Sequence, residues 1–160
     1  SIVKKLKKDG YEVSIENMME RLSDIAGIRI ICSFTSDIYQ IADMISSQGD
    51  VTVLHVKDYI KNPKPNGYRS LHLVVEVPVY LSDSQQQVRV EIQIRTIAMD
   101  FWASLEHELH YKLSEEIPDG VAEELAQCAG IIAETDRRME AIAVRLNQLP
   151  KPGAEDASAR

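Results

Sequence analysis

Apolar residues follow two different periods along the chain of 160 residues. Alternating or short apolar runs bounded by turn residues predict strands at Gly27–Ser33, Val51–Lys57, Ser70–Leu81 and Val88–Arg95. Spacings of three and four predict helices at Ile2–Lys8, Ser14–Ser23, Asp37–Gln48, Thr96–Leu113 and Pro118–Leu149. Because helices and strands are mixed without regular alternation, we expect an α+β or mixed α/β fold with one sheet flanked by helices.

The last two predicted strands are joined by the short polar link Ser82–Gln87, which favours an antiparallel hairpin. Each strand carries apolar residues on one face and polar residues on the other. The polar residues are Ser70, His72 and Glu76 on the first strand and Arg89, Glu91, Gln93 and Arg95 on the second. Pairing of the strands would merge them into one surface that carries carboxylates, a histidine and arginines. The alternative is an ordinary solvated face.

The segment Tyr59–His72 combines turn residues with lysines and tyrosines. Two prolines restrict its backbone, and Asn66-Gly67 favours a turn. An aromatic ring between cations suits a nucleotide, because the ring stacks on the base and the cations bind the phosphates. The alternative is a basic surface loop.

The net charge of −7 is distributed unevenly. Residues 106–140 contain ten acidic and three basic residues, so the rest of the chain is balanced. Basic residues cluster at Lys4, Lys5, Lys7 and Lys8, and again at Lys57, Lys61, Lys64 and Arg69. A locally basic but acidic protein suits a small polyanion better than nucleic acid, which requires a broad positive surface. Scattered solvated lysines are the alternative.

The cysteines, Cys32 and Cys128, form neither a disulfide framework nor a zinc-binding pattern, which favours the cytoplasm. The sequence contains no apolar run long enough for a membrane span and no signal segment at its start. Because it begins with Ser1, we expect it to start partway into a longer protein. The polar tail, residues 150–160, is expected to be flexible.

A further candidate site lies where a predicted helix meets the first strand, in Asp24-Ile25-Ala26-Gly27-Ile28-Arg29. A carboxylate at the mouth of a strand, close to an arginine, is able to bind a metal ion beside a cation. A helix end followed by a surface arginine is the alternative interpretation.

Together, four segments in this order and spacing resemble the RelA/SpoT-type alarmone synthetases, and most closely the small stand-alone members. They are the run from Arg21 to Arg29, the loop from Lys64 to His72, the strand from Val90 to Thr96 and the helix from Phe101 to His107. The resemblance covers about residues 1–113. It implies an α+β, nucleotidyltransferase-like fold with a mixed sheet flanked by helices.

The resemblance also implies transfer of pyrophosphate from ATP to the 3′-hydroxyl of GDP or GTP, giving AMP and ppGpp or pppGpp. Asp24 and Glu91 match the family's catalytic, Mg²⁺-binding carboxylates, and Glu91 matches the group held to activate the hydroxyl. Arg29 matches the arginine that stacks on adenine, and Tyr68 the tyrosine that stacks on guanine. Lys64 and His72 match residues near the guanosine phosphates, while Asn66 and Gln93 shape that pocket.

Two features differ from longer relatives. The family places further basic residues on a helix upstream of Ser1, and only residues 1–6 of that helix are present, with Lys5 as the ATP-phosphate ligand that remains. The bifunctional relatives carry a hydrolase domain with a His-Asp pair, which this sequence lacks, so we do not expect product degradation.

The last predicted helix carries an apolar seam with alternating steps of four and three residues, which is typical of a helix–helix contact. The seam contains Val121, Leu125, Cys128, Ile132, Thr135, Met139, Ile142 and Leu146. It can pack on its own domain or on another chain. We expect a homo-oligomer, because similar small synthetases form tetramers regulated by alarmone. The predicted organisation is a synthetase domain at 1–113, an oligomerisation helix at 114–149 and the tail.

Two alternative functions remain. One is a nucleotide-binding regulatory module that has lost catalysis, and the other is a toxin-like relative that modifies adenine nucleotides or transfer RNA. The acidic balance of the chain argues against a transfer RNA substrate.

Overall fold

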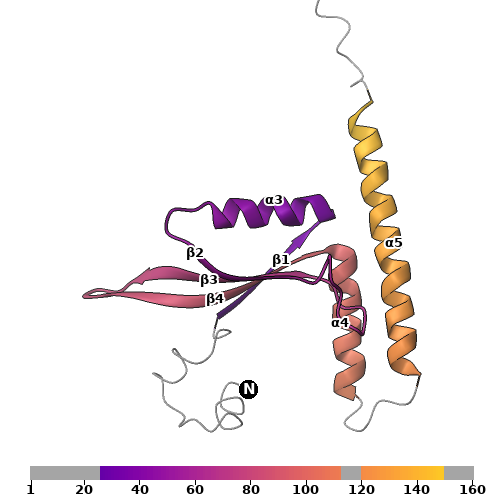
Figure 1. Cartoon of the computed structure of the whole chain (residues 1–160), viewed down its shortest axis with the longest axis horizontal. Helices are drawn as coiled ribbons and strands as arrows, with labels where there is room; N and C mark the ends of the chain where they lie inside the picture. The colour runs from indigo at the N-terminus through magenta and orange to yellow at the C-terminus, as the bar shows by residue number, and fades with distance from the viewer. Residues whose placement is uncertain (1–25, 113–119, 150–160) are drawn as a thin grey trace, which may run out of the picture.

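The computed structural model describes residues 26–112 and 120–149. Its elements are β1 (Ala26–Cys32), α3 (Thr35–Ser46), β2 (Thr52–Asp58), β3 (Leu71–Tyr80), β4 (Gln85–Thr96), α4 (Ile97–Lys112) and α5 (Val121–Asn147) (Figure 1). The predicted helices at Ile2–Lys8 and Ser14–Ser23 lie outside the described residues. The other predicted elements are confirmed, with ends that differ by no more than three residues.

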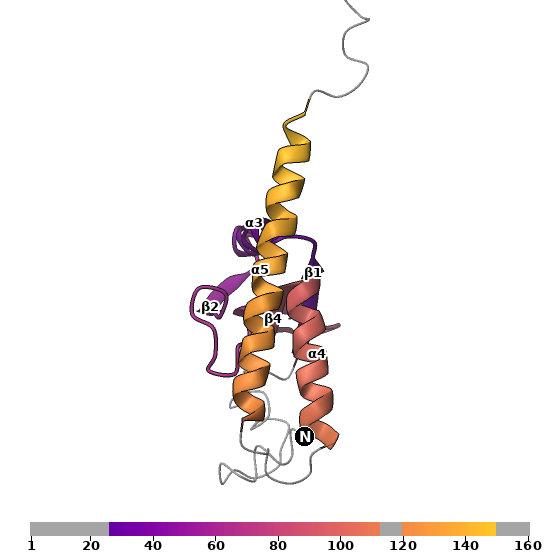
Figure 2. The same ribbon diagram turned by 90° about the vertical axis from the view of Figure 1, so that its right-hand side faces the viewer.

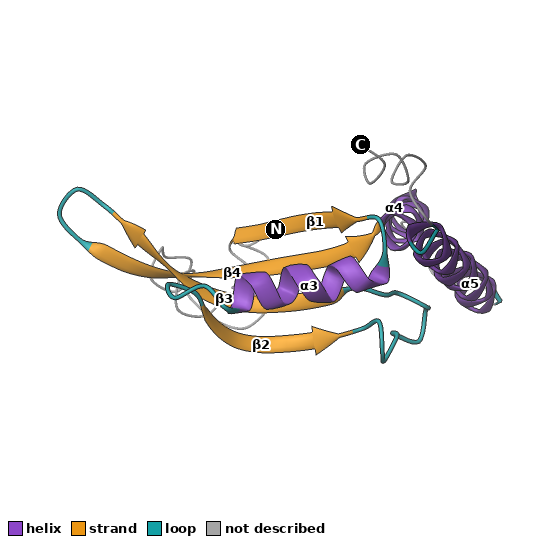
Figure 3. Cartoon of the chain, turned by 90° about the horizontal axis from the view of Figure 1, so that it is seen from above, coloured by secondary structure: helices purple, strands orange, loops and turns teal. Residues whose placement is uncertain are grey.

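The four strands form one mixed sheet in the order β1-β4-β3-β2 (Figure 3). β1 pairs with β4 in parallel, whereas the β3–β4 and β2–β3 pairs are antiparallel. The predicted hairpin is therefore confirmed, although β4 begins three residues early, at Gln85, which pairs with Tyr80. Leu81 N–H donates to the Ser84 carbonyl at 2.8 Å and closes the turn. The glutamines at the start of β4 are part of the strand because they pair with β3. Their polar side chains alone do not predict a strand there.

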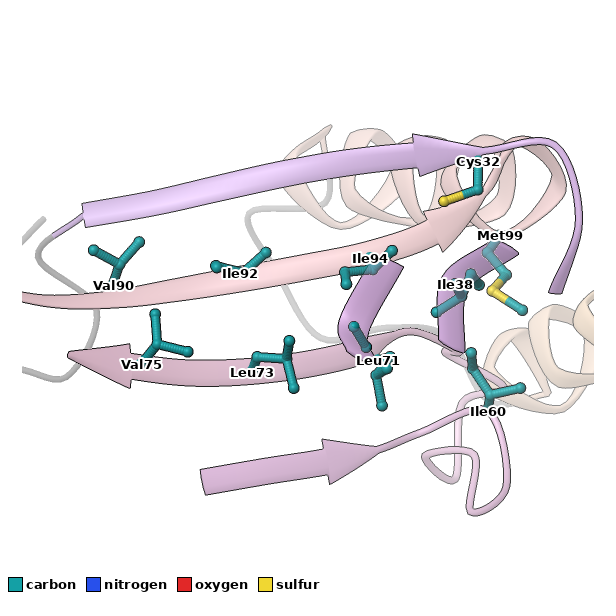
Figure 4. Close-up of a cluster of buried hydrophobic side chains, with 11 residues drawn as sticks. Cys32, Ile38, Ile60, Leu71, Leu73, Val75, Val90, Ile92, Ile94 and Met99 are labelled. Atoms are coloured by element: carbon teal, nitrogen blue, oxygen red, sulfur yellow. The ribbon is translucent and has the colours of Figure 1, made fainter. Parts of the chain in front are cut away.

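The core lies between α3 and one face of the sheet (Figure 4). Ile38 from α3 and Leu73, Val75 and Ile94 from the hairpin are almost completely buried there. The other buried members are Cys32, Ala42, Ile60, Leu71, Val90, Ile92 and Met99. The alternating apolar residues of the hairpin thus face α3, and their polar neighbours face the opposite side of the sheet.

α4 and α5 run side by side at one end of the sheet (Figures 1 and 2). Thr96 ends β4, and its hydroxyl oxygen accepts a hydrogen bond from Met99 N–H at 3.1 Å in the first turn of α4. The same hydroxyl donates to the Asp136 carboxylate of α5 at 2.7 Å. α5 also reaches α3, where Glu140 accepts a hydrogen bond from Ser36 N–H at 2.9 Å. α5 is therefore anchored both to the end of the sheet and to the helix that covers the core.

The predicted seam of α5 is used only in part by contacts within the chain. Leu125 and Ile132 pack against the buried Trp102 of α4. Met139 and Leu146, further along the seam, are 56% and 61% exposed. Within residues 26–112 and 120–149, no helix combines the length and apolar character needed to cross a membrane.

The first prediction concerns Asp136. Burial raises the pKa of its carboxyl above the ordinary value of 3.8, and the nearby Glu140 charge adds to this, against the opposing hydrogen bond from Thr96 and the charge of Arg69. Because the folded state disfavours the carboxylate, wild type loses stability as the pH rises from about 3.8 through the raised pKa. The unfolding free energy of Asp136→Asn, measured relative to wild type in urea, should therefore increase over this pH interval.

Glu134→Gln on the same helix provides a control of opposite sign. The hydrogen bond from Arg138 and the charge of Arg137 lower the pKa of the exposed Glu134 carboxyl below 4.5. The stability of this variant relative to wild type should fall slightly as the pH rises toward 4.5 and should depend on salt. The same trend with pH in both variants would contradict the account of Asp136.

Candidate functional site

A row of polar side chains crosses the face of the sheet opposite α3. Strand register places Arg29 of β1 beside Gln93 of β4, and Gln93 beside His72 of β3. Glu91 lies two residues before Gln93 and therefore on the same face. The two strands of the hairpin thus share one polar surface, as their pattern predicted, and Arg29 joins it from β1, which that pattern did not predict.

A chain of hydrogen bonds runs through four side chains at this surface, from Arg95 to Glu91. Arg95 Nη2 donates to the Tyr68 hydroxyl at 2.7 Å. The hydroxyl lies 2.8 Å from His72 Nε2, and His72 Nδ1 lies 2.9 Å from Glu91 Oε1. Gln93 completes a ring, because it accepts from Arg95 Nη2 at 2.8 Å and donates to Glu91 Oε2 at 3.3 Å. Both oxygens of the Glu91 carboxylate are therefore held in place by neighbouring side chains.

The direction of this chain follows from the chemistry of its members. The Glu91 carboxylate can only accept a hydrogen bond, so His72 Nδ1 carries the proton. Burial lowers the pKa of the His72 imidazole, the charges of Arg95 and Lys64 act in the same direction, and the interaction with Glu91 only partly offsets them. Nε2 of the neutral ring is then an acceptor for the Tyr68 hydroxyl. The network aligns His72 as a donor to Glu91.

The 59–70 loop, which joins β2 to β3, presents Tyr68 to this network. Gly67 N–H donates to the Lys64 carbonyl at 2.8 Å and closes the predicted Asn66-Gly67 turn, in which Gly67 has φ +90°. Lys64 N–H donates to the Tyr68 carbonyl at 3.1 Å, and Tyr68 N–H donates to the Asn66 side chain at 3.2 Å. The loop is therefore a hydrogen-bonded turn that fixes the position of Tyr68.

The expected combination of aromatic rings and cations is present around Tyr68. The Lys64 ammonium lies 4.7 Å from the centre of the Tyr68 ring and 4.9 Å from that of Tyr59. The Arg95 guanidinium lies 5.1 Å from the centre of the Tyr68 ring. A purine that stacks on Tyr68 has to displace one of these cations, and Lys64 is the exposed and flexible one.

The other basic residues of the loop, Lys61 and Arg69, interact with groups other than the Tyr68 ring. Lys61 pairs with Asp58 at 3.5 Å and lies over the Tyr39 ring. Arg69 is half-buried and donates to the Ile60 carbonyl at 2.9 Å. Lys61 and Arg69 thus each interact with a partner within the protein, and the expectation that the basic residues of this segment suit a small polyanion stays a prediction.

Asp100 is a member of the site that the sequence patterns did not single out. Its Oδ1 lies 3.2 Å from Arg95 Nη1 and 3.4 Å from Arg29 Nη1, so it links the two arginines across the sheet. The sequence feature that could have identified Asp100 is its position in the first turn of α4, five residues after Arg95 at the end of β4. An acidic residue there also interacts favourably with the helix dipole.

A pocket of about 430 Å³ opens between this network and α4. Arg29, Tyr68 and Arg95 line one side, and Glu106 and His107 line the other. The Asn66 side chain donates to Glu106 Oε1 at 3.1 Å, so the loop and α4 are joined at the rim. The volume of this pocket falls within the range of small-molecule binding sites.

The structure brings together Arg29, Lys64, Asn66, Tyr68, His72, Glu91 and Gln93 from the predicted site. Asp24 and Lys5 lie outside the described residues. Within the described part, the arrangement offers a stacking ring, cations for phosphate groups and an oriented carboxylate that can accept a proton or bind a divalent cation.

Comparison with families and curated relatives agrees with this geometry. A family model described as the region found in RelA / SpoT proteins matches residues 1–116. GTP pyrophosphokinase YwaC of Bacillus subtilis (strain 168) is 52% identical over 139 residues, which cover 87% of this chain and 66% of the relative. GTP pyrophosphokinase YjbM of the same strain is 44% identical over 124 residues, covering 78% of this chain and 59% of the relative. The chain thus spans slightly under two thirds of the length of these relatives.

Solved structures agree with the fold. The small alarmone synthetase 2 from Bacillus subtilis has a TM-score of 0.82 and 49% sequence identity, covering 90% of this chain and 74% of that one. The small alarmone synthetase 1 from the same organism, bound to its product pppGpp, has a TM-score of 0.81 and 38% identity, covering 92% and 75%. The predicted mixed sheet with flanking helices and a long last helix is therefore confirmed.

The second prediction tests the hydrogen-bond chain. Tyr68→Phe leaves the buried His72 Nε2 without its donor and removes one acceptor of Arg95. We expect it to lower the unfolding free energy in urea by about 1–3 kcal/mol. Tyr59→Phe is the matched control, because among the described residues the Tyr59 hydroxyl makes no hydrogen bond while its ring contacts Tyr68 and His72. Equal effects of the two variants would contradict a structural role of the Tyr68 hydroxyl.

Proposed function

Because the chain belongs to the RelA/SpoT family, we propose that it is a GTP pyrophosphokinase, which transfers pyrophosphate from ATP to the 3′-hydroxyl of GDP or GTP. The products are AMP and ppGpp or pppGpp. The observation that carries the proposal is the continuous hydrogen-bonded path from the Tyr68 ring, through His72, to the Glu91 carboxylate. This path supports the proposal because it joins an aromatic side chain, suited to stacking on a purine, to a carboxylate that can accept a proton.

Tyr68 stacks on the guanine in this proposal, and Glu91 accepts the proton of the attacking 3′-hydroxyl. That hydroxyl is a poor nucleophile at neutral pH, so a positioned base contributes roughly 10²–10⁴ in rate. His72 and Gln93 orient the carboxylate through their hydrogen bonds. Glu91 remains 25% exposed and is thus accessible to the acceptor.

The other predicted residues are assigned by charge and position. Lys64 leaves the tyrosine rings to bind the guanosine phosphates, and His72 lies at the base of the same subsite. Asn66, held by Glu106, shapes the guanine pocket. On the donor side, Arg29 is exposed and stacks on adenine, with Asp100 holding its guanidinium. Lys5 binds the ATP phosphates.

Mg²⁺ is the proposed cofactor. Its preference is for oxygen ligands, usually one or two carboxylates together with substrate phosphates. The Glu91 carboxylate fits, because each oxygen accepts one hydrogen bond from the protein and has further lone pairs. Asp24 is the second proposed ligand. The bound ion would neutralise phosphate charge as the pyrophosphate is transferred.

We also propose a homotetramer, regulated by alarmone, whose subunits meet along the apolar seam of α5 and the neighbouring start of α4. A groove of about 570 Å³ there is lined by Phe34, Ile97, Phe101, Ile132 and Met139. Ile97 and Phe101 are 63% and 57% exposed. The exposed end of the seam, at Ile142 and Leu146, continues this surface. A contiguous apolar surface of this kind favours a second copy of the chain as its occupant.

A cytoplasmic location is part of the same proposal. Cys32 and Cys128 are both free thiols, as expected in a reducing compartment.

The third prediction concerns Glu91→Gln. With labelled ATP and GDP, GTP or GMP, and products separated by charge, transfer should fall at least about 100-fold, because the amide neither accepts the proton nor binds the metal ion as a carboxylate does. GDP affinity should remain nearly unchanged. Glu76→Gln is the control, since this carboxylate shares the sheet face but pairs with Arg89 at 3.0 Å. Normal turnover of Glu91→Gln would refute the assigned role.

The fourth prediction concerns assembly. The double variant Met139→Lys with Ile142→Lys places charges on the apolar seam and should shift the protein to smaller species in light scattering at micromolar concentration. Ala141→Lys adds one such charge at an exposed position outside the seam and should leave the assembly intact. A monomeric wild-type protein would contradict the proposed tetramer.

A further inference from the structure

α5 touches the 59–70 loop at a point where neither side has room for a larger side chain. A Cβ atom built on Gly67 would lie 2.4 Å from the Ala129 Cβ and 3.4 Å from the Ala126 Cα. Gly67 also has a positive φ of 90°, which side chains disfavour. The turn that precedes Tyr68 therefore rests directly on the helix, and the position of the helix limits the position of the turn.

The same two elements also meet at a small cavity, where a charge of the loop acts on a carboxyl group of α5. Asp136 of α5 is buried, with 8% exposure, and the positive charge of Arg69 in the loop favours its carboxylate. Arg69, Asp136, Gly67 and Ala129 all line one small cavity of about 20 Å³. Asp136 also accepts the hydrogen bond from Thr96, the residue after Arg95. α5 thus holds the loop and the end of β4 at a fixed separation.

The aromatic platform itself packs on this junction. Tyr68 lies against the cluster of Trp102, Ala103 and Ala129. The Trp102 indole N–H donates to the Leu125 carbonyl at 3.1 Å, which ties α4 to α5 beneath the ring. The ring of Tyr68 is therefore supported from below by both helices, while its hydroxyl is held by the hydrogen-bond chain.

We propose that α5 is the support of the guanosine-binding loop, and that Ala129 and Asp136 are positioning residues for the acceptor nucleotide. This inference rests on the proposed function for its kinetic consequence. The contacts of α5 with Gly67 and Tyr68 lie on the proposed acceptor side, whereas the proposed adenine ligand Arg29 is held by Asp100 of α4 and has no contact with α5 among the described residues. A displacement of α5 should therefore weaken acceptor binding and leave ATP binding unaffected.

The test compares Ala129→Val with Ala141→Val, which adds the same atoms at an exposed position of α5, in the full-length protein. Ala129→Val should raise the KM for GDP or GTP about tenfold or more, because small displacements of binding groups are costly. The KM for ATP and kcat at saturating acceptor should stay close to wild type. Ala129→Ser, which adds a single atom, should fall between Ala129→Val and wild type. A variant that merely folds poorly would lower kcat through loss of active protein and leave both KM values unchanged.

Hydrogen exchange of the nucleotide-free proteins tests the support without relying on activity. Ala129→Val should speed exchange of the loop amides, including the Gly67 N–H that is bonded to Lys64, while Ala141→Val should not. If wild type transfers no pyrophosphate, the proposed function fails and this comparison alone decides the inference. Unchanged exchange, or equal increases in both KM values, would overturn it.

Asp136→Asn covers the case in which Ala129→Val does not fold. It preserves the side-chain volume and an oxygen that can accept the Thr96 hydrogen bond, but removes the charge that faces Arg69. We expect a higher KM for the acceptor, an unchanged KM for ATP and faster exchange of the loop amides. An acceptor KM equal to that of wild type in this folded variant would show that Asp136 has no positioning role.

Discussion

The hydrogen bond between His72 and Glu91 orients the Glu91 carboxylate, and the neighbouring residues of the site hold the two partners of this bond in place. His72 donates from Nδ1 because burial keeps the ring neutral and Tyr68 occupies Nε2. Tyr68 is aligned in turn by Arg95, which Asp100 holds from α4. On the proposed function, a carboxylate oriented in this way loses little freedom when substrates bind, which is how a largely electrostatic transfer gains rate.

The fold supplies two different supports for this network. Below the sheet face, the apolar side chains of the hairpin pack on α3, so the alternating polar residues are presented on a rigid surface. At the end of the sheet, α4 and α5 hold the loop that carries Tyr68. On the two proposals together, adjacent faces of α5 support the acceptor nucleotide and contact neighbouring subunits, and Asp136 lies where they meet. Assembly and acceptor binding would thus share one helix.

Much of this arrangement was accessible from the sequence, because strict alternation in Val88–Arg95 and Ser70–Leu81 determines which residues share a face. The turn at Asn66-Gly67 was equally readable. Asp100 and Glu106 were not singled out, since acidic residues on a helix usually face solvent. Only the packing of α4 brings Glu106 to the pocket and Asp100 to the two arginines. The seam pattern also did not predict the support from α5, because Ala129 and Asp136 lie off the apolar heptad. Their partners, Gly67 and Thr96, are distant in sequence. The placement of Asp24 and Lys5 remains a prediction.

The most direct measurement of the central claim is a crystal structure of the protein with GDP and a non-hydrolysable ATP analogue in the presence of Mg²⁺. The account predicts guanine stacked on Tyr68 and the ribose 3′-hydroxyl about 2.6–3.2 Å from a Glu91 oxygen, with His72 still bonded to the other side of that carboxylate. Guanine bound away from Tyr68, or a Glu91 carboxylate out of reach of both the hydroxyl and the metal ion, would contradict it.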